Sequence, residues 1–254
     1  MKKLLAITAL SAALFFGQTV AAEEKAAEEV KPSHVEMVLV LDESGSMSDL
    51  TRDTIGGFNS MIEKEKKLDV DAHVTTVLFN DQYKMLYNRR ELKDVRKMTD
   101  KDYTPGGMTA LLDAVGRTIH KMDMVSGIHR KDKGNKVLFV IITDGEENDS
   151  KEYTYADVKK LIKDRQENAG WEFIFLGANI DAAAAAENLG IDRDRAVKYK
   201  NTGSGVRANF KAVAELSDSL AKSGRVSDEW KETVEKDEDD AADKQSAAVT
   251  SPRR

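Results

Sequence analysis

Three oxygen-bearing side chains follow one apolar run near the start of the chain. Asp42, Ser44 and Ser46 come directly after residues 37–41, in the order Asp-Glu-Ser-Gly-Ser. A hard divalent cation such as Mg²⁺ prefers oxygen ligands at about 2.0–2.1 Å in octahedral geometry. Alternate residues of an extended segment point to the same side, and Gly45 between the two serines leaves the backbone free to bend. One carboxylate and two hydroxyls at this spacing therefore suit such a cation.

Two further loops carry oxygen donors in comparable positions. Asp144 follows the apolar run 137–142, and Thr109 follows a Gly-Gly pair at the start of a stretch of helix length, where it could equally be an N-cap. Ligands of an open parallel sheet bind outside the carboxyl ends of the strands. If the strands before Asp42 and Asp144 are neighbours, their backbones are about 4.8 Å apart. Two carboxylates so close repel each other unless a cation lies between them.

The elements that must position these residues alternate along the chain. Apolar runs of strand length alternate with amphipathic stretches of helix length, which is typical of βα units around a mostly parallel sheet. The two runs that precede Asp42 and Asp144 are continuously apolar, which indicates central strands buried on both faces. We expect strands at residues 35–41, 72–79, 136–143, 171–176 and 196–199, with an antiparallel edge strand at 83–87. We expect helices at residues 51–66, 109–123, 155–168, 182–189 and 206–223, the fourth of them capped by Asp181.

The first 22 residues have the pattern of a secretory signal peptide. Two lysines precede an apolar stretch over residues 4–16, and the small residues Val20 and Ala22 predict cleavage after Ala22. The alternative, an uncleaved membrane anchor, is disfavoured because a spanning helix needs about 20 apolar residues. The chain contains no cysteine, so it has no thiol for a lipid anchor. We therefore expect an exported protein, periplasmic or secreted, with no stable membrane anchor after signal cleavage.

Composition divides the remaining chain into three parts. Residues 23–34 are rich in Glu, Ala and Lys and predict a flexible linker, residues 35–224 form the folded domain, and residues 225–254 predict an acidic disordered tail. Signal cleavage removes two lysines and no acid, which leaves 37 basic against 45 acidic residues and a net charge of −8. Nucleic acid is not an expected partner, because binding it needs a basic face.

Other catalytic and metal-binding patterns are missing from the sequence. His34, His73, His120 and His129 lack the spacing of a helix or hairpin zinc pair, and no cysteine can join them, so we expect no zinc site. The two serines are not in a G-x-S-x-G elbow, and no histidine can be assigned as their base. We therefore expect no enzymatic activity. Metal-dependent hydrolysis would need a base beside the metal, for which Glu146 and Glu147 are the candidates.

The order of the three segments gives the chain a family resemblance. Asp-x-Ser-x-Ser, a threonine after Gly-Gly, and Asp-Gly after an apolar strand resemble the von Willebrand factor A (vWA) domain with its metal-ion-dependent adhesion site (MIDAS), as found in small bacterial proteins. The resemblance covers about residues 35–223, and every ligand position of the motif is filled: Asp42, Ser44, Ser46, Thr109 and Asp144. It implies an α/β fold with a Rossmann-like, doubly wound, mostly parallel central sheet, one antiparallel edge strand and helices on both faces.

The resemblance also implies a function. In this family the two serines usually bind Mg²⁺ directly, the aspartates bind directly or through water, and the threonine joins when a ligand is held; Mn²⁺ or Ca²⁺ are alternatives. An acidic residue of a partner protein commonly fills the last coordination position. We therefore expect a binding protein that captures a partner's carboxylate, with a metal-dependent hydrolase or a purely structural ion site as alternatives. Glu146, Glu147 and Asp149 could support the site, repel an acidic partner, or form a solvated loop.

Overall fold

The computed structural model describes residues 34–68, 70–124, 135–227 and 229–236. Its central sheet has six strands in the order β3-β2-β1-β4-β5-β6. Only β3 (Tyr83–Glu91) is antiparallel to its neighbour; the parallel strands are β1 (His34–Asp42), β2 (Ala72–Phe79), β4 (Asn135–Thr143), β5 (Glu172–Gly177) and β6 (Ala196–Lys198). This confirms the predicted mostly parallel sheet with one antiparallel edge strand. The predicted signal peptide lies outside the described residues, as does the predicted linker except His34.

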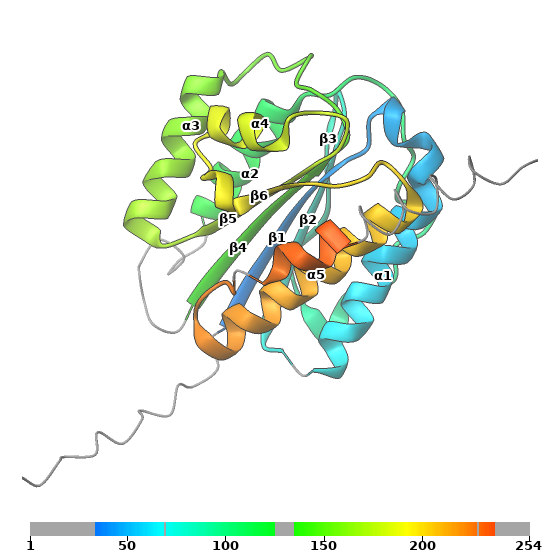
Figure 1. The fold of residues 1–254 in the computed structure, drawn as a ribbon, viewed down its shortest axis with the longest axis vertical. Coiled ribbons are helices and arrows are strands. Elements are labelled where there is room, and N and C mark those ends of the chain that lie inside the picture. Colours follow the sequence, from blue (N-terminus) through cyan, green and yellow to red (C-terminus); the bar gives the residue numbers. More distant parts are fainter. Residues whose placement is uncertain (1–33, 69, 125–134, 228, 237–254) are drawn as a thin grey trace, which may run out of the picture. The chain divides into compact units, whose positions relative to one another are not determined.

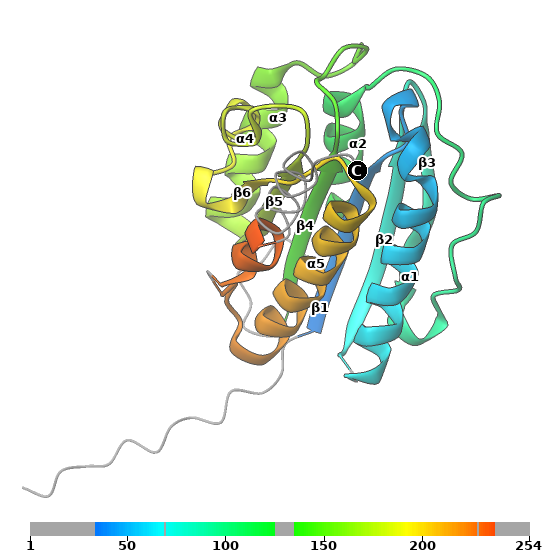
Figure 2. The same cartoon turned by 45° about the vertical axis from the view of Figure 1, so that its right-hand side comes forward.

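Helices cover both faces of the sheet (Figures 1 and 2). One face packs against α1 (Thr51–Lys67) and α5 (Gly203–Ser223), and the other against α2 (Leu111–Asp123), α3 (Tyr155–Asp164) and α4 (Ala182–Leu189). Successive side chains of a strand point to opposite faces. In β1, Met37 and Leu39 accordingly join the first core while Val38 and Val40 join the second. Both faces of β1 are buried, as its continuous apolar run predicts.

The predicted site lies at the point where the strand order of the sheet reverses, between β1 and β4. From β1 the chain moves outward to β2 and β3, and it then returns to β4 on the other side of β1. β1 and β4 are hydrogen-bonded neighbours, with Leu41 opposite Ile142. Asp42 ends β1 and Asp144 follows β4, so the two carboxylates lie side by side at the carboxyl edge. This is the crevice in which open α/β sheets bind ligands.

Helix starts agree with capping chemistry, with one informative difference. The amide of Ala184 donates to the Asp181 side chain at 3.0 Å, which confirms the predicted cap of α4. Helix α2 begins at Leu111 rather than at residue 109, and its N-cap position is Ala110, which makes no side-chain cap. Thr109 is therefore not the helix cap that its position in sequence could suggest. Among the described residues, no helix is both long and apolar enough to cross a membrane.

The disordered tail predicted for residues 225–254 includes residues that are folded in the structure. Gly224 ends α5 in the left-handed conformation, with φ 67°, and the chain then turns back along the helix. Val226, Trp230 and Val234 are buried in the core that lies under α1 and α5, and residues 230–236 are helical. Within this helix Trp230 and Val234, four residues apart, lie on one face, and Thr233 donates to Glu215 of α5 at 2.7 Å. Residues 237–254 lie outside the described part of the chain.

A buried acid between α1 and α5 makes stability depend on pH. Glu65 is 0% exposed; one carboxylate oxygen accepts from Ser217 at 2.8 Å, and the other has no hydrogen-bond partner among the described residues. Burial, together with the charge of Asp218, raises the pKa of Glu65 to about 7. The folded state therefore binds this proton more tightly than the unfolded state does. Stability should fall as pH rises from about 4.5 to about 7.

Glu65→Gln should remove this pH dependence, because the amide cannot ionise and can still accept from Ser217. Relative to the wild type, we expect the variant to gain about 3 kcal/mol of stability between pH 4.5 and pH 8. Urea unfolding of both proteins across this range measures the difference, and all other titrating groups cancel in it. Unfolding free energies that stay parallel over the whole range would contradict the assignment.

Candidate metal site

Asp42 is held rigidly at the end of β1. Its side chain is buried, with Oδ1 accepting from the amide of Ser44 at 2.7 Å and Oδ2 accepting from the Thr143 hydroxyl at 2.5 Å. The backbone carbonyl of Asp42 accepts from the Tyr103 hydroxyl at 2.6 Å. Neighbouring strand β4 thus fixes the rotamer of a carboxylate on β1. The arrangement preorganises one negative group at the sheet edge.

The two serines connect this carboxylate to the second one. Ser44 Oγ and Ser46 Oγ lie 3.1 Å apart, and Ser46 Oγ donates to Asp144 Oδ1 at 2.6 Å. Asp144 Oδ2 accepts from the side-chain amide of Asn201 at 3.2 Å, and its backbone carbonyl accepts from Asn179 at 3.3 Å. The loops after β1 and β4 therefore meet through their own side chains.

Thr109 comes from the third loop and faces the same space. A methyl group built onto Gly145 would lie 3.6 Å from Thr109 Oγ1 and 3.9 Å from Ser46 Oγ. The backbone of Thr109 is anchored to the loop after β4, because its amide donates to Asn148 Oδ1 at 2.8 Å and its carbonyl accepts from the Asn148 amide at 3.0 Å. The Gly-Gly turn before it bonds to the first loop, with the amide of Gly45 donating to the Gly107 carbonyl at 3.2 Å. All five predicted residues are thus brought to one edge of the sheet.

The electrostatics of the two carboxylates favour a cation. Burial raises the pKa of Asp42, hydrogen bonds from Ser44 and Thr143 lower it in part, and the charge of Asp144 raises it further. Beside them, Tyr199 Oη and Asn201 Oδ1 are buried polar atoms without a hydrogen-bond partner among the described residues. Buried polar atoms of this kind ordinarily have a partner. A cation with its waters would supply partners and relieve the repulsion.

The spacing of the donor atoms fits a small octahedral ion. Ligands at 2.0–2.1 Å from a Mg²⁺ ion lie about 2.9 Å from their neighbours in the octahedron. The separations of 3.1 Å between the two serine oxygens and 2.6 Å between Ser46 and Asp144 lie on either side of this value. Two carboxylates and three hydroxyls are also the hard oxygen donors that Mg²⁺, Mn²⁺ and Ca²⁺ prefer.

Glu147, in the acidic loop after Asp144, is structural, whereas the sequence left the role of this loop open. Glu147 accepts from the amides of Leu112, Asp149 and Ser150 and from the Ser150 hydroxyl, at 2.7–3.0 Å. It therefore caps the start of α2 and orders its own loop. Glu146 is exposed, and Asp149 contacts Lys151 at 3.4 Å.

Several residues that position the site were not predicted from the sequence. Thr143, Asn148 and Asn201 contribute through hydrogen bonds to a predicted ligand rather than by facing the site. Of these three residues, Thr143 could most readily have been predicted, because a hydroxyl at the end of an apolar central strand, next to Asp144, must find a polar partner. Asn201 lies 57 residues beyond Asp144, and no local pattern connects the two.

The comparison with known families agrees with this architecture. The family model of the vWA domain found in the C terminus of TerF matches residues 34–191, which is more than half of the chain. The chain belongs to this family of vWA domains. No curated protein sequence matches it.

Solved structures share the fold of this vWA domain at low sequence identity. The pilus adhesin SpaC from Lactobacillus rhamnosus GG has a TM-score of 0.59 and 14% identity over 76% of this chain and 31% of its own. The vWF domain of the type V pili tip protein Mfa5 from Porphyromonas gingivalis has a TM-score of 0.53 and 12% identity over 78% and 99%. Proximal thread matrix protein 1 from the mussel byssus has a TM-score of 0.50 and 13% identity over 73% and 46%. The chain thus spans less than half the length of SpaC and of the byssus protein.

Proposed function

We propose that this vWA-domain protein is an exported binding protein that uses a divalent cation to capture an acidic residue of a partner protein. The observation that carries the proposal is the convergence of Ser44, Ser46 and Asp144 oxygens at 2.6–3.1 Å, beside Asp42 and Thr109, at the edge where the strand order reverses. We assign Mg²⁺ to this MIDAS-type site, with Mn²⁺ or Ca²⁺ as alternatives.

The two aspartates would balance the charge of the ion, and their hydrogen-bond partners fix the geometry of the site. When bound, the ion supplies an electrophilic position for one more carboxylate, because two aspartates balance its charge and the hydroxyl ligands add none. Thr143 and the Ser44 amide keep both oxygens of Asp42 in place, and Asn201 orients Asp144. Because these partners hold the ligands in advance, little conformational entropy is lost when an acidic side chain arrives.

The solved structures with a similar fold support a protein as the partner. Among the similar structures, SpaC is a pilus adhesin and Mfa5 is a pilus tip protein. The predicted signal peptide over residues 1–22 would bring the domain to the periplasm or the outside of the cell, where such a partner would be met.

We propose a non-catalytic role. The hydrolase alternative requires a free base beside the ion, for which the sequence offers Glu146 and Glu147. Glu147 uses its carboxylate to accept four hydrogen bonds that shape the loop and the start of α2. A base so engaged is poorly placed to take a proton from water. The hydrolase alternative is then left with Glu146, an exposed residue of the same loop, as its candidate base.

Capture of partners should depend on the ion and on both serines. Tagged protein is incubated with an extract of extracytoplasmic proteins in Mg²⁺ or in chelator, with a Ser44→Ala, Ser46→Ala double variant as control. We expect at least a tenfold loss of the retained partner in chelator and in the double variant. Retention of the same partners under all three conditions would show that capture does not use the ion.

A melting curve with and without Mg²⁺ separates the structural alternative. An ion that binds only the folded state raises the melting temperature whether or not a partner exists. If Mg²⁺ stabilises the wild type but changes no partner binding, the ion serves only to tie the three loops together. Binding and stabilisation that both disappear in the double variant support capture.

A further inference from the structure

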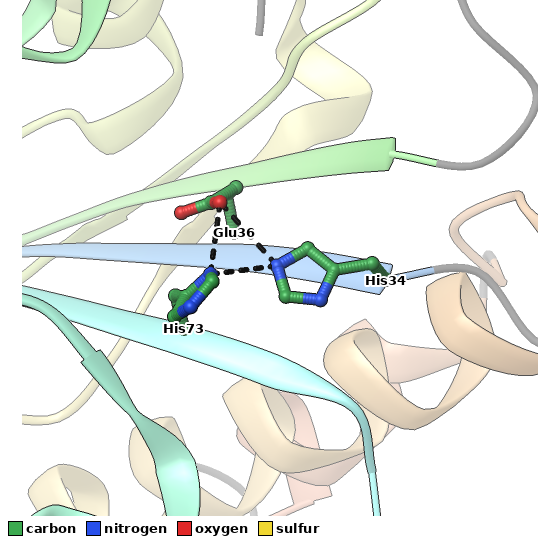
Figure 3. Close-up of side chains that lie close together, drawn as sticks. All are labelled: His34, Glu36 and His73. Atoms are coloured by element: carbon green, nitrogen blue, oxygen red, sulfur yellow. Dashed lines mark hydrogen bonds and ion pairs between the residues drawn. The ribbon is translucent and has the colours of Figure 1, made fainter. Parts of the chain in front are cut away.

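A second group of metal-ligand side chains lies at the opposite end of the sheet. His34, Glu36 and His73 converge on one another at the amino ends of β1 and β2 (Figure 3). Asp42, by contrast, lies at the carboxyl end of β1. The two groups share no residue.

Strand geometry explains why these three side chains meet. His34 and Glu36 are two residues apart on β1, so they point to the same face of the sheet. His73 is the register partner of Glu36 on the neighbouring parallel strand β2. Three adjacent positions on one face therefore carry two imidazoles and a carboxylate. The prediction that no zinc site exists rested on the separation of the histidines along the sequence. Pairing of β1 with β2 brings His34 and His73 together although they are 39 residues apart.

The donor atoms are spaced as the ligands of one ion. His34 Nε2 lies 2.9 Å from His73 Nδ1 and 3.3 Å from Glu36 Oε1, and the last two atoms are 3.1 Å apart. A circle through three atoms at these separations has a radius of about 1.8 Å, so a point at the Zn–N and Zn–O bond length of about 2.0–2.1 Å exists beside all three. Two histidines and one glutamate are a ligand set of zinc and related transition ions.

Hydrogen-bond directions show which donors a bound ion would replace. Arg89 Nη2 approaches His73 Nδ1 at 3.1 Å, and a guanidinium can only donate, so this imidazole nitrogen is an acceptor. His34 Nδ1 contacts Asp71 Oδ1 at 3.1 Å, which is the contact of a donating N–H. His34 Nε2 faces two acceptors, His73 Nδ1 and Glu36 Oε1, so it carries a proton in the ion-free protein, and a bound ion would displace that proton. A carboxylate behind a histidine in this way is a common support of metal-binding imidazoles.

We propose that His34, Glu36 and His73 form a binding site for Zn²⁺ or a similar divalent transition ion, independent of the site at the carboxyl edge. Glu36 is almost fully buried, while the His34 and His73 side chains are 18% and 27% exposed. The two histidines line an open pocket of about 500 Å³ together with Asp71 and Glu91. The pocket gives an ion a route to the site and leaves room for water in the fourth position.

Arg89 is the rival cation of this site. Its guanidinium binds both oxygens of Glu36, through Nε at 3.0 Å to Oε2 and through Nη2 in a short contact to Oε1. Its backbone has φ 45°, a conformation rare for a residue other than glycine, at an irregular stretch of β3. A bound ion would take over Oε1 and His73 Nδ1, while Nε of Arg89 can keep Oε2. Removing the guanidinium should therefore strengthen metal binding rather than weaken it.

The test titrates Zn²⁺ into the purified full chain by calorimetry at pH 7.5, with Mg²⁺ present throughout. We expect one Zn²⁺ per chain in the wild type, at least a 100-fold loss of affinity in His34→Ala and in His73→Ala, and equal or tighter binding in Arg89→Gln. His120→Ala is the matched control, because His120 is an exposed histidine outside the cluster, hydrogen-bonded to Tyr153. The Ser44→Ala, Ser46→Ala variant should keep its Zn²⁺ site.

A spectroscopic readout needs no variant. Co²⁺ in place of Zn²⁺ should give visible absorption bands of a four-coordinate ion, and these bands should vanish when Zn²⁺ is added. A wild type that shows neither Zn²⁺ binding nor Co²⁺ bands would overturn the proposal. The cluster would then be a hydrogen-bonded network in which Arg89 neutralises Glu36. The same conclusion follows if His73→Ala and His120→Ala bind Zn²⁺ as the wild type does.

Discussion

Replacing Asp144 by asparagine is expected to abolish the stabilisation of the protein by Mg²⁺ while leaving the metal-free protein at least as stable as the wild type. Asp144 and Asp42 repel each other at the edge of the sheet, and this repulsion contributes to the raised pKa of Asp42. The variant removes one of the two charges. Without metal it should therefore lose no stability, and with metal it loses a carboxylate that balances the dication.

The size of the effect follows from what supporting groups alone contribute. Loss of a residue that only orients a metal ligand costs about 10–100-fold in affinity, so loss of a carboxylate facing the ion should cost about 100-fold or more. The substitution Asp144→Asn also fits locally. Asn201 Oδ1 has no partner among the described residues, so rotation of the Asn201 amide lets this oxygen accept from the introduced amide, in place of the bond that Asn201 now donates.

Melting curves and Mg²⁺ calorimetry on both proteins measure this prediction. Glu146→Gln is the matched control, because it removes one charge from the same loop at an exposed position. If Glu146→Gln and Asp144→Asn weaken Mg²⁺ binding equally, the ion responds to the general negative potential rather than to a ligand set.

Trp230→Ala should destabilise the protein by about 3–5 kcal/mol, the cost of truncating a large buried aromatic side chain. Trp230 is 2% exposed and packs with Val226 and Val234 in the core under α1 and α5. Such a loss is a large share of the about 5–15 kcal/mol that stabilises a typical domain. The segment after Gly224 is then part of the folded domain rather than a solvated tail.

Urea unfolding measures the loss, and Trp230→Phe is its control. Phenylalanine keeps most of the apolar surface and removes the indole N–H, which has no hydrogen-bond partner among the described residues. We expect it to cost much less than alanine. An unfolding free energy of Trp230→Ala within about 0.5 kcal/mol of the wild type, as for an ordinary surface substitution, would place this segment outside the core.

The fold and the five candidate ligands could be predicted because their signals are local. Continuous apolar runs before Asp42 and Asp144 identify two central strands, and neighbouring parallel strands end at the same edge of a sheet. The structure makes those strands neighbours, which brings the carboxylates together. Thr109 was ambiguous in the sequence, because a threonine before a helix is most often its cap. Only the observed start of α2 at Leu111 separates the two roles.

What the sequence did not predict depends on distant partners or on sparse patterns. His34 and His73 become neighbours only through the register of β1 and β2, which spacing along the chain does not encode. The folded segment after Gly224 carries its signal in three apolar residues, Val226, Trp230 and Val234, among charged residues that dominate the composition. A count of charges predicts disorder there, whereas the four-residue spacing of the apolar side chains indicates a packed helix.

A crystal structure of the protein grown with Mn²⁺, with anomalous diffraction measured at the manganese edge, would locate a divalent ion bound at the carboxyl edge of the sheet. We expect one anomalous peak bonded to Ser44 Oγ and Ser46 Oγ, flanked by Asp42, Thr109 and Asp144. At least one coordination position should be filled by water or by a carboxylate from another molecule. A peak absent from this edge of the sheet, or an ion whose ligands all come from this chain, would contradict the proposed function.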